Sequence, residues 1–220
     1  MNELDPYLSS ALLIIFLLGI FGLCLLSRDS VGNRNLTKAR QAKVDLNTFV
    51  RNGPGKKNSK HNYLFSEENV VSMTYGYNGR FDHAVARWDT GPILVAVIER
   101  KFPRSVLPDA LKQEDMFQLS LYTLALKEKG FSCSSTKLVT IYCLQDEAIE
   151  CLKKQSGLDC LHCEKGKSFN SKFNEKKTLK HLARLDEVWN QERKPKPNPS
   201  LENCRACPFT KNKKCEFSVV

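Results

Sequence analysis

The sequence predicts an α/β protein whose mixed sheet is flanked by helices and preceded by one transmembrane helix. β-branched and aromatic residues are frequent in three consecutive segments between residues 68 and 101. A helical pattern follows over 108–130 and a further apolar strand over 137–144. Antiparallel strands that lead into a helix and then another strand favour a mixed sheet. An apolar run near the N-terminus predicts the membrane helix.

Residues 1–27 are expected to form the membrane anchor. The run from Leu8 to Leu26 is interrupted only by two serines and two glycines, and its nineteen residues would span about 28 Å as a helix, close to the thickness of a bilayer core. A cleaved signal peptide would need a basic start, a shorter apolar core and small residues before the cut, and the sequence has none of these. A buried core helix, the alternative, would normally carry a polar face.

Residues 28–62 are expected to form a basic, flexible linker. Nine Lys or Arg residues and two acids lie between Arg28 and Lys60, and Gly53-Pro54-Gly55 interrupts regular structure. Basic residues flanking a membrane span stay on the cytoplasmic side, so a single-pass protein with its 63–220 domain in the cytoplasm is expected. The linker is a solvated tether in the simplest interpretation, and contact with anionic lipid or DNA backbone is the alternative.

An antiparallel meander is predicted at the start of the folded domain. Its strands are Glu68 to Tyr77, Arg80 to Trp88 and Ile93 to Lys101, and Asn78-Gly79 is the predicted hairpin turn. Glu99 and Lys101 point to the same face of the third strand while Arg100 faces away, because side chains alternate along a strand. If the second strand pairs beside it, Asp82 and Glu99 converge at one edge of the sheet.

Further elements follow the meander. A helix is expected from Pro108 to Gly130 with a buried stripe, then a strand from Lys137 to Leu144 and an amphipathic helix from Thr178 to Glu192. The stripe consists of Leu111, Phe117, Leu121, Leu124 and Ala125. Residues 148–154 fit either a strand or a helix, and 194–200 is a proline-rich spacer.

Two carboxylates beside an ammonium suit a Mg²⁺ or Mn²⁺ ion with a poised water. Asp82, Glu99 and Lys101 have this chemistry, although a pair of strands with an exposed charge pair is the structural alternative. Gln118 and Tyr122 follow, four residues apart and therefore on one face of the predicted helix.

The order G-x-x-D, E-x-K and Q-x-x-x-Y resembles the RecB-like branch of the PD-(D/E)XK nuclease superfamily, which includes the CRISPR-associated RecB-like exonucleases. The resemblance covers about Val70 to Cys215 and leaves out the N-terminal third. It implies a restriction-endonuclease-like fold and a metal-dependent nuclease, expected to be an exonuclease, that acts on single-stranded DNA or DNA ends.

The resemblance also implies roles for single residues. Asp82, Glu99 and the backbone carbonyl of Arg100 would bind the metal, and Lys101 would orient the attacking water or stabilise the transition state. Gln118 and Tyr122 would position the substrate or the water. A histidine upstream of the first acidic motif often completes the metal site in this family, which makes His61 a candidate. His83 should point to the opposite face of its strand from Asp82.

A cysteine tail, Cys204, Cys207 and Cys215 within residues 194–220, has the spacing of a metal site. In RecB-like exonucleases a similar tail binds a [4Fe–4S] cluster with a fourth cysteine upstream of the acidic motifs. This chain departs from that pattern, because no cysteine lies between Leu25 and Ser132. Cys160, His162 or Cys163 is the candidate fourth ligand. A zinc site made of Cys160, Cys163, Cys204 and Cys207 and metal-free reduced thiols are the alternatives.

Bulk composition limits the class of partner. A net charge of +10 and a pI of about 9.2 suit nucleic acid or an anionic membrane surface. Nine cysteines, an odd number clustered in C-x-x-C pairs, do not match a secreted disulfide framework. Two functions besides the nuclease stay open: a catalytically inactive, membrane-anchored nucleic-acid-binding protein, and an anchored adaptor that binds a protein through the cysteine tail.

Overall fold

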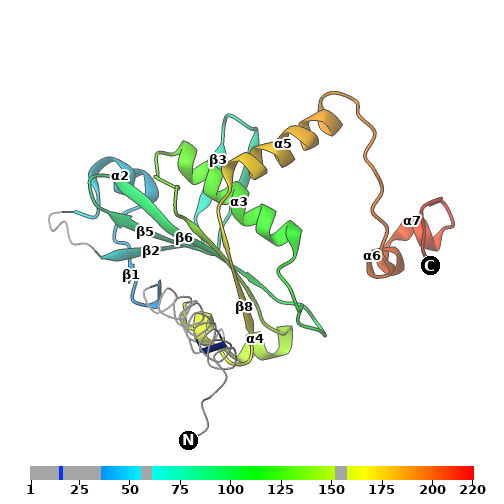
Figure 1. Cartoon of the computed structure of the whole chain (residues 1–220), viewed down its shortest axis with the longest axis horizontal. Helices are drawn as coiled ribbons and strands as arrows, with labels where there is room; N and C mark the ends of the chain where they lie inside the picture. The colour runs from blue at the N-terminus through cyan, green and yellow to red at the C-terminus, as the bar shows by residue number, and fades with distance from the viewer. Residues whose placement is uncertain (1–14, 17–35, 56–60, 152–157) are drawn as a thin grey trace, which may run out of the picture. The chain divides into compact units, whose positions relative to one another are not determined.

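A computed structural model describes residues 15–16, 36–55, 61–151 and 158–220 (Figure 1). The chain divides into two compact units, Met1–Thr178 and Leu179–Val220. The first unit contains β1 (Arg40–Gln41), α2 (Leu46–Asn52), β2 (Asn62–Ser66), β3 (Asn69–Ser72), β4 (Tyr77–Arg80), β5 (His83–Trp88), β6 (Pro92–Lys101), α3 (Gln113–Glu128), β7 (Lys137–Tyr142), α4 (Gln145–Cys151), the 3₁₀ turn η1 (Asp159–His162) and β8 (Lys167–Lys172). Helix α5 (Glu175–Trp189) begins in the first unit and continues into the second, which also holds α6 (Leu201–Ala206) and α7 (Pro208–Lys211).

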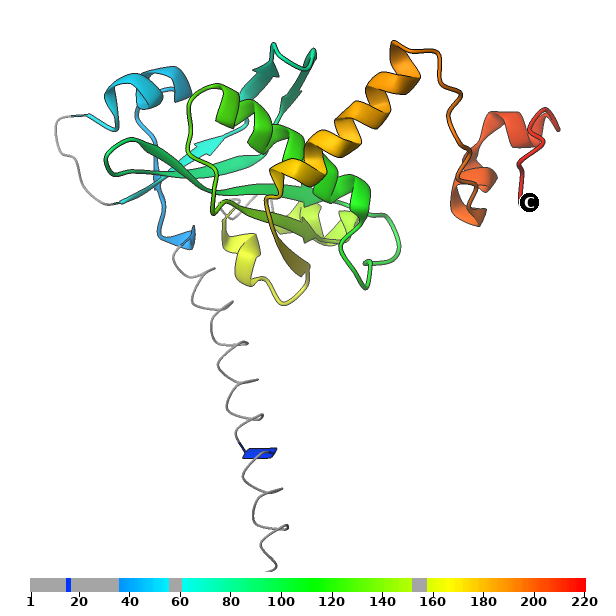
Figure 2. The same ribbon diagram turned by 45° about the horizontal axis from the view of Figure 1, so that its top comes forward.

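A six-stranded mixed sheet of order β1-β2-β5-β6-β7-β8 forms the first unit, which confirms the predicted fold class of a mixed sheet flanked by helices. The pairs β1–β2 and β6–β7 are parallel, and the other neighbours are antiparallel. Parallel neighbours need a crossover connection, and α3 supplies it between β6 and β7. Figures 1 and 2 show α3 lying across one face of the sheet.

Both faces of the central strands are buried. On one face Phe49 of α2 and Leu119 of α3 pack with Val97, and on the other Leu36 and the η1 segment pack with Ile98. Neighbouring residues of β6 therefore belong to two different cores. This double burial accounts for the continuous apolar run in β6, which an alternating surface strand would not show.

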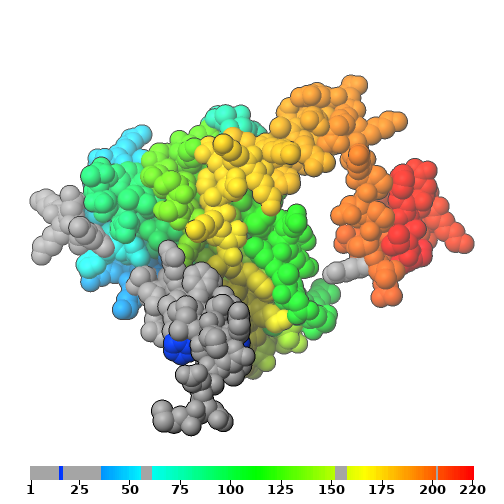
Figure 3. Space-filling view, in the orientation of Figure 1, coloured from blue at the N-terminus to red at the C-terminus, as the bar shows by residue number. Residues whose placement is uncertain are grey.

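Residues 36–55 fold against the sheet, whereas the sequence analysis expected a flexible linker over 28–62. Asp45 caps α2 by accepting a hydrogen bond from the Thr48 amide, and Phe49 is fully buried with its ring 5.2 Å from that of Phe65. The space-filling view shows the blue and cyan atoms of this region packed against the green ones (Figure 3). Because basic residues dominate this region, its few buried apolar residues were not recognised in the sequence. Residues 28–35 and 56–60 lie outside the described part of the chain.

The predicted meander is only partly right. Strands β5 and β6 pair antiparallel as expected, but β3 and β4 form a separate two-stranded sheet. The turn between them covers residues 73–76, and Asn78-Gly79 lies inside β4 instead of forming the turn. The neighbour of β5 in the main sheet is β2, which the sequence analysis placed at the end of the linker and the start of the domain.

Later elements follow the predicted order with shifted boundaries. Helix α3 begins at Gln113, not Pro108, and buries Leu119, Tyr122 and Leu126 more deeply than the predicted stripe residues Phe117 and Leu121. Strand β7 and helix α5 are present as expected, and the ambiguous segment is helical in α4 up to Cys151. Strand β8, rich in Lys, Ser and Asn, was not predicted.

The predicted anchor, residues 8–26, lies outside the described residues apart from Ile15 and Phe16. Among the residues that the structure describes, no helix combines the length and apolar character needed to cross a bilayer.

Candidate active site

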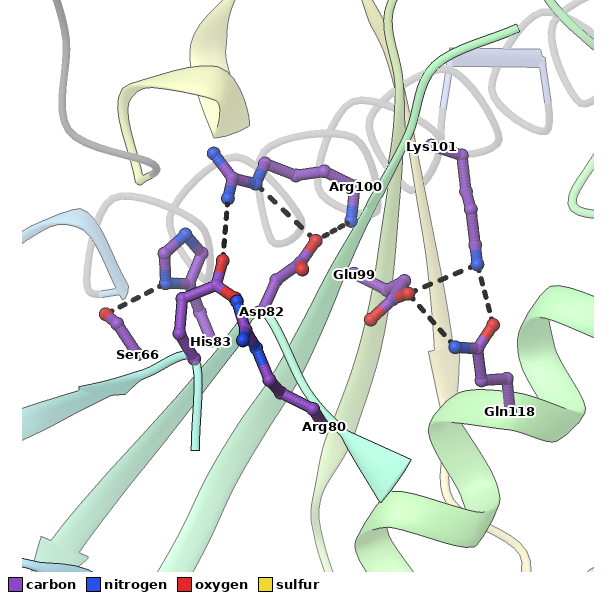
Figure 4. Close-up of polar contacts among 9 residues, drawn as sticks. Ser66, Arg80, Asp82, His83, Glu99, Arg100, Lys101 and Gln118 are labelled. Carbon is purple, nitrogen blue, oxygen red and sulfur yellow. Dashed lines mark hydrogen bonds and ion pairs between the residues drawn. The ribbon is translucent and has the colours of Figure 1, made fainter. Parts of the chain in front are cut away.

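Asp82 lies immediately before β5, at the edge where β6 ends. The β5–β6 pairing extends from Trp88–Pro92 at one end to His83–Ile98 at the other. Asp82 lies just beyond this second end, in the short connection between β4 and β5. The Glu67 amide donates a 2.9 Å hydrogen bond to the Asp82 carbonyl, which holds the backbone at Asp82 in place. The Asp82 Oδ2 atom accepts a 2.7 Å hydrogen bond from the Arg100 amide, so the carboxylate is tied to the end of the neighbouring strand (Figure 4).

Glu99, Lys101 and Gln118 form one hydrogen-bonded group on the side of β6 that faces α3 (Figure 4). Lys101 Nζ lies 3.1 Å from Glu99 Oε1 and 2.6 Å from Gln118 Oε1. Gln118 Nε2 lies 3.1 Å from Glu99 Oε1 and 2.6 Å from the Tyr122 hydroxyl oxygen. The E-x-K alternation and the four-residue helical spacing therefore bring these residues together as the sequence predicted.

Glu99 is the residue best suited to bind a cation. It is buried, and its Oε2 atom has no hydrogen-bond partner among the described residues. Burial, and then the neighbouring Asp82 carboxylate, raise the pKa of Glu99 above its ordinary value, although Lys101 opposes this. An unpartnered buried carboxylate oxygen near a second carboxylate fits a divalent ion, which Mg²⁺ sites commonly hold with one or two carboxylates plus waters and phosphate oxygens.

Lys101 is held as a cation. Burial lowers its pKa, but the Glu99 carboxylate and then Asp115, whose Oδ1 is 3.5 Å from Nζ, outweigh burial and raise the pKa above the ordinary value for lysine. Asp115 was not predicted from the sequence. Its position three residues before Gln118 places it on the same helix face, and this spacing was the available sign.

Tyr122 packs against backbone at Gly79. A Cβ atom at residue 79 would lie 2.6 Å from Tyr122 Cε1, closer than any ordinary contact. Gly79 is therefore needed for close approach between β4 and α3, not for the turn that the Asn78-Gly79 pair suggested. The hydroxyl of the largely buried Tyr122 is held by Gln118, so Gln118 contacts Glu99 and Lys101 directly and Tyr122 reaches them only through Gln118.

Arg100 lies on the other side of β6 from Glu99 and Lys101, as the alternation predicted, and His83 lies on the same side as Arg100 (Figure 4). The Arg100 guanidinium lies 3.5 Å from Asp82 and 3.4 Å from Glu67, which Arg80 also contacts. His83 Nδ1 lies 3.0 Å from Ser66 Oγ, and burial followed by the Arg100 charge lowers the pKa of the imidazole. Glu67 and its contacts with Arg80 and Arg100 were not predicted, and no motif in the sequence marks Glu67.

His61 is not brought to this site. It immediately precedes β2, whose first residue, Asn62, pairs with Arg87, whereas the last, Ser66, pairs with His83 beside Asp82. Five residues at about 3.3 Å each separate His61 from Ser66, or roughly 17 Å. The expected role of His61 as a metal ligand therefore has no support in this geometry.

The tail cysteines lie in the second unit. Cys204 is buried in α6, and its carbonyl accepts from the Cys207 amide at 3.2 Å, which forms a tight C-x-x-C turn. Hydrogen bonds from the Thr210 and Phe209 amides lower the pKa of the Cys207 thiol. Among residues 36–55, 61–151 and 158–220, no three His, Cys, Asp or Glu side chains are already gathered closely enough to hold an ion.

Comparison with known proteins gives no assignment: no protein-family model matches the chain, and no curated protein shows significant sequence similarity to it.

Proposed function

We propose that this protein is a metal-dependent DNA nuclease of the PD-(D/E)XK, RecB-like type, most simply an exonuclease, tethered to a membrane through residues 8–26 with its catalytic domain in the cytoplasm. One observation carries the proposal. Asp82 is hydrogen-bonded to the amide of Arg100, the residue between Glu99 and Lys101, while Lys101 contacts Glu99 and Glu99 Oε2 is buried and unpartnered among the described residues.

Asp82, Glu99 and the Arg100 carbonyl are the residues that would hold Mg²⁺ or Mn²⁺. When bound, such an ion activates water for attack and neutralises charge on the phosphate. Glu99 binds it only in the ionised form, so the chain's own burial of this carboxylate sets the pH range in which the site can be loaded.

Lys101 stabilises developing negative charge. Because its pKa is raised, the ammonium stays protonated at neutral pH and is not a base that takes a proton from water. Gln118 accepts from Lys101 and donates to Glu99, so it acts as a positioning residue between them. Tyr122 in turn orients Gln118. Gln118 and Tyr122 make these contacts in the protein itself, in addition to any contact with the substrate.

Basic surface and the cysteine tail complete the proposal. A net charge of +10 supplies salt-dependent, sequence-independent affinity for the phosphates of single-stranded DNA or DNA ends. Cys204, Cys207 and Cys215 fit three ligands of a [4Fe–4S] cluster, with structural Zn²⁺ as the alternative, because their thiols are free and two of them form a tight turn. This centre stabilises the C-terminal unit and takes no part in hydrolysis.

A second candidate is an inactive nucleic-acid-binding protein on the same scaffold. Its supporting observation is the engagement of Asp82 by both the amide and the guanidinium of Arg100, which gives the carboxylate a structural role. Under this alternative the site would bind no divalent ion, and DNA binding would survive chelation.

The test is cleavage of end-labelled single- and double-stranded DNA by the full-length protein, purified without air, in Mg²⁺ or Mn²⁺. Activity should disappear with chelator and in Glu99→Ala, but persist in Glu114→Ala, an exposed acid in the first turn of α3. A folded wild type that binds DNA without cutting it under any of these conditions would reject the nuclease and favour the second candidate.

A further inference from the structure

Four cysteines outside the tail come from three segments that meet at one end of the sheet. Cys143 directly follows β7, Cys151 is the last residue of α4, Cys160 lies in η1, and Cys163 directly follows η1. All four are free thiols. They belong to the first unit, whereas the tail cysteines belong to the second.

The loop after η1 lies against Cys143. A Cβ atom at Gly166 would be 2.9 Å from the Tyr142 carbonyl oxygen and 3.9 Å from Cys143 Cβ. Cys163 precedes Gly166 by three residues, and its amide donates to the Cys160 carbonyl at 3.4 Å. Cys160 and Cys163 therefore share one tight C-x-x-C turn, the arrangement that directs two thiolates to one metal.

Helix α4 faces the same loop. Glu147 forms an ion pair with Lys165, which lies between Cys163 and Gly166. Cys151 is four residues after Glu147 and thus on the same helix face. The electrostatics agree with this placement: burial, followed by the charges of Cys163, Cys151 and Cys160, raises the pKa of the Cys143 thiol. Cys163, Cys151 and Cys160 therefore each lie close enough to Cys143 for their charges to act on its thiol.

We infer that Cys143, Cys151, Cys160 and Cys163 form a four-thiolate site for a soft metal centre, either Zn²⁺ or an iron–sulfur cluster. These two centres share the same ligand chemistry, four cysteine thiolates. No three of these thiols lie at ligand distance in the described structure, so metal binding requires them to move closer together. Loading the site draws η1 and α4 together and releases thiol protons.

The four-cysteine site lies next to the strand that carries the candidate active site. The Cys143 amide donates to the Lys101 carbonyl at 3.0 Å, so the end of β7 is joined to the strand that carries Glu99 and Lys101. A centre that binds Cys143 to α4 and η1 fixes this end of the sheet from the face opposite α3. The inference does not depend on nuclease activity, because its primary readout is metal content.

The test uses full-length protein produced with iron and zinc both supplied and purified without air. Metal and acid-labile sulfide per chain are measured for the wild type and for the double variants Cys160→Ser/Cys163→Ser and Cys204→Ser/Cys207→Ser. Cys133→Ser is the matched control, because Cys133 is a buried free thiol whose sulfur donates hydrogen bonds to the carbonyls of Thr123 and Phe131 and not to any of the four cysteines. The metal that the wild type holds and the Cys160/Cys163 variant lacks identifies the centre: about one zinc indicates the zinc form, and iron with sulfide indicates a cluster.

We expect the Cys160/Cys163 variant to lose one complete centre, and the Cys204/Cys207 variant and Cys133→Ser to retain it. If the first variant does not fold, Cys151→Ser at the half-exposed end of α4 should fold and release its metal to a chelator at least tenfold faster than the wild type. Three results would overturn the inference: a metal-free wild type, full metal content in the Cys160/Cys163 variant, or loss of the same single centre in both double variants, which would show a site shared with the tail.

Discussion

Gly79→Ala tests the link between the β3–β4 hairpin and the candidate site. The added methyl group would lie 2.6 Å from Tyr122 Cε1 and 3.4 Å from Cδ1. The residue has no positive φ, so the substitution adds volume without backbone strain. The ring must move by almost an ångström to restore ordinary contact, and its hydroxyl then leaves Gln118 Nε2, which it meets at 2.6 Å.

The change in the free energy of unfolding caused by Gly79→Ala is the sum of destabilising and stabilising contributions. Overpacking a buried site costs about 1–3 kcal/mol, and losing the Gln118–Tyr122 hydrogen bond adds about 0.5–1.5 kcal/mol. Alanine favours a strand over glycine by roughly 0.5–1 kcal/mol, which offsets part of this. Gly79→Ala should therefore lower the free energy of unfolding by about 1–3 kcal/mol.

Urea unfolding followed by tryptophan fluorescence measures this change, because Trp88 packs against Phe49 in the first unit. Gly91→Ala is the matched control: nothing lies within 4 Å of a Cβ at this position, and no positive φ is involved. A difference between the two variants below about 0.5 kcal/mol would refute the packing argument, since the two substitutions then cost the same despite a contact present in only one.

Three further outcomes are expected. Lys101→Met should lower kcat by about 10²–10³-fold while Mg²⁺ binding measured by calorimetry is kept, and Lys127→Met, which removes a lysine paired with Glu175, should leave both unchanged. Because the pKa of Glu99 is raised, Mg²⁺ affinity should decline as the pH falls and should do so above the usual glutamate range, which metal titrations at a series of pH values would show. In chelator-treated protein, iodoacetamide should modify Cys207, whose thiol pKa is lowered, long before the buried Cys133, whose pKa burial raises to about 12, as followed by mass spectrometry.

Short-range patterns identified the central elements and the core of the site. The β-branched run of β6 predicts a strand, and the two-residue spacing of Glu99 and Lys101 places both side chains on one face of it, because the alternation of side chains along a strand is a local property. Gln118 and Tyr122 share a face because the helical period is local too. These predictions needed no knowledge of the partner strands.

Features that depend on distant segments were missed. Gly79 resembled a turn residue, and only the ring of Tyr122, over forty residues away, explains its presence inside β4. Strand β2 and helix α2 were hidden because polar and basic residues surround the few apolar anchors, of which Phe49 is buried completely. The polar strand β8 is specified by its pairing with β7 and not by its own composition.

The two sides of β6 differ in how their charges are balanced. On the Arg100 side, two guanidinium groups, Arg100 and Arg80, serve the two carboxylates of Asp82 and Glu67. This side is close to neutral, so Asp82 is held in place without a metal. Because Arg100 contacts the Asp82 carboxylate through both its amide and its guanidinium, this carboxylate stabilises the fold as well as belonging to the candidate site.

The α3 side of the strand has an excess of negative charge. Lys101 is the one cation recorded within salt-bridge distance of Glu99 or Asp115 among the described residues, so a single ammonium serves two carboxylates. Ionised Glu99 is therefore unfavourable in the metal-free fold: with its folded pKa raised, the stability it contributes in acid is lost as the pH rises through that value. A divalent cation at Glu99 Oε2 would remove this cost. The excess charge that destabilises the fold at neutral pH would thus favour the metal binding proposed at the end of β6.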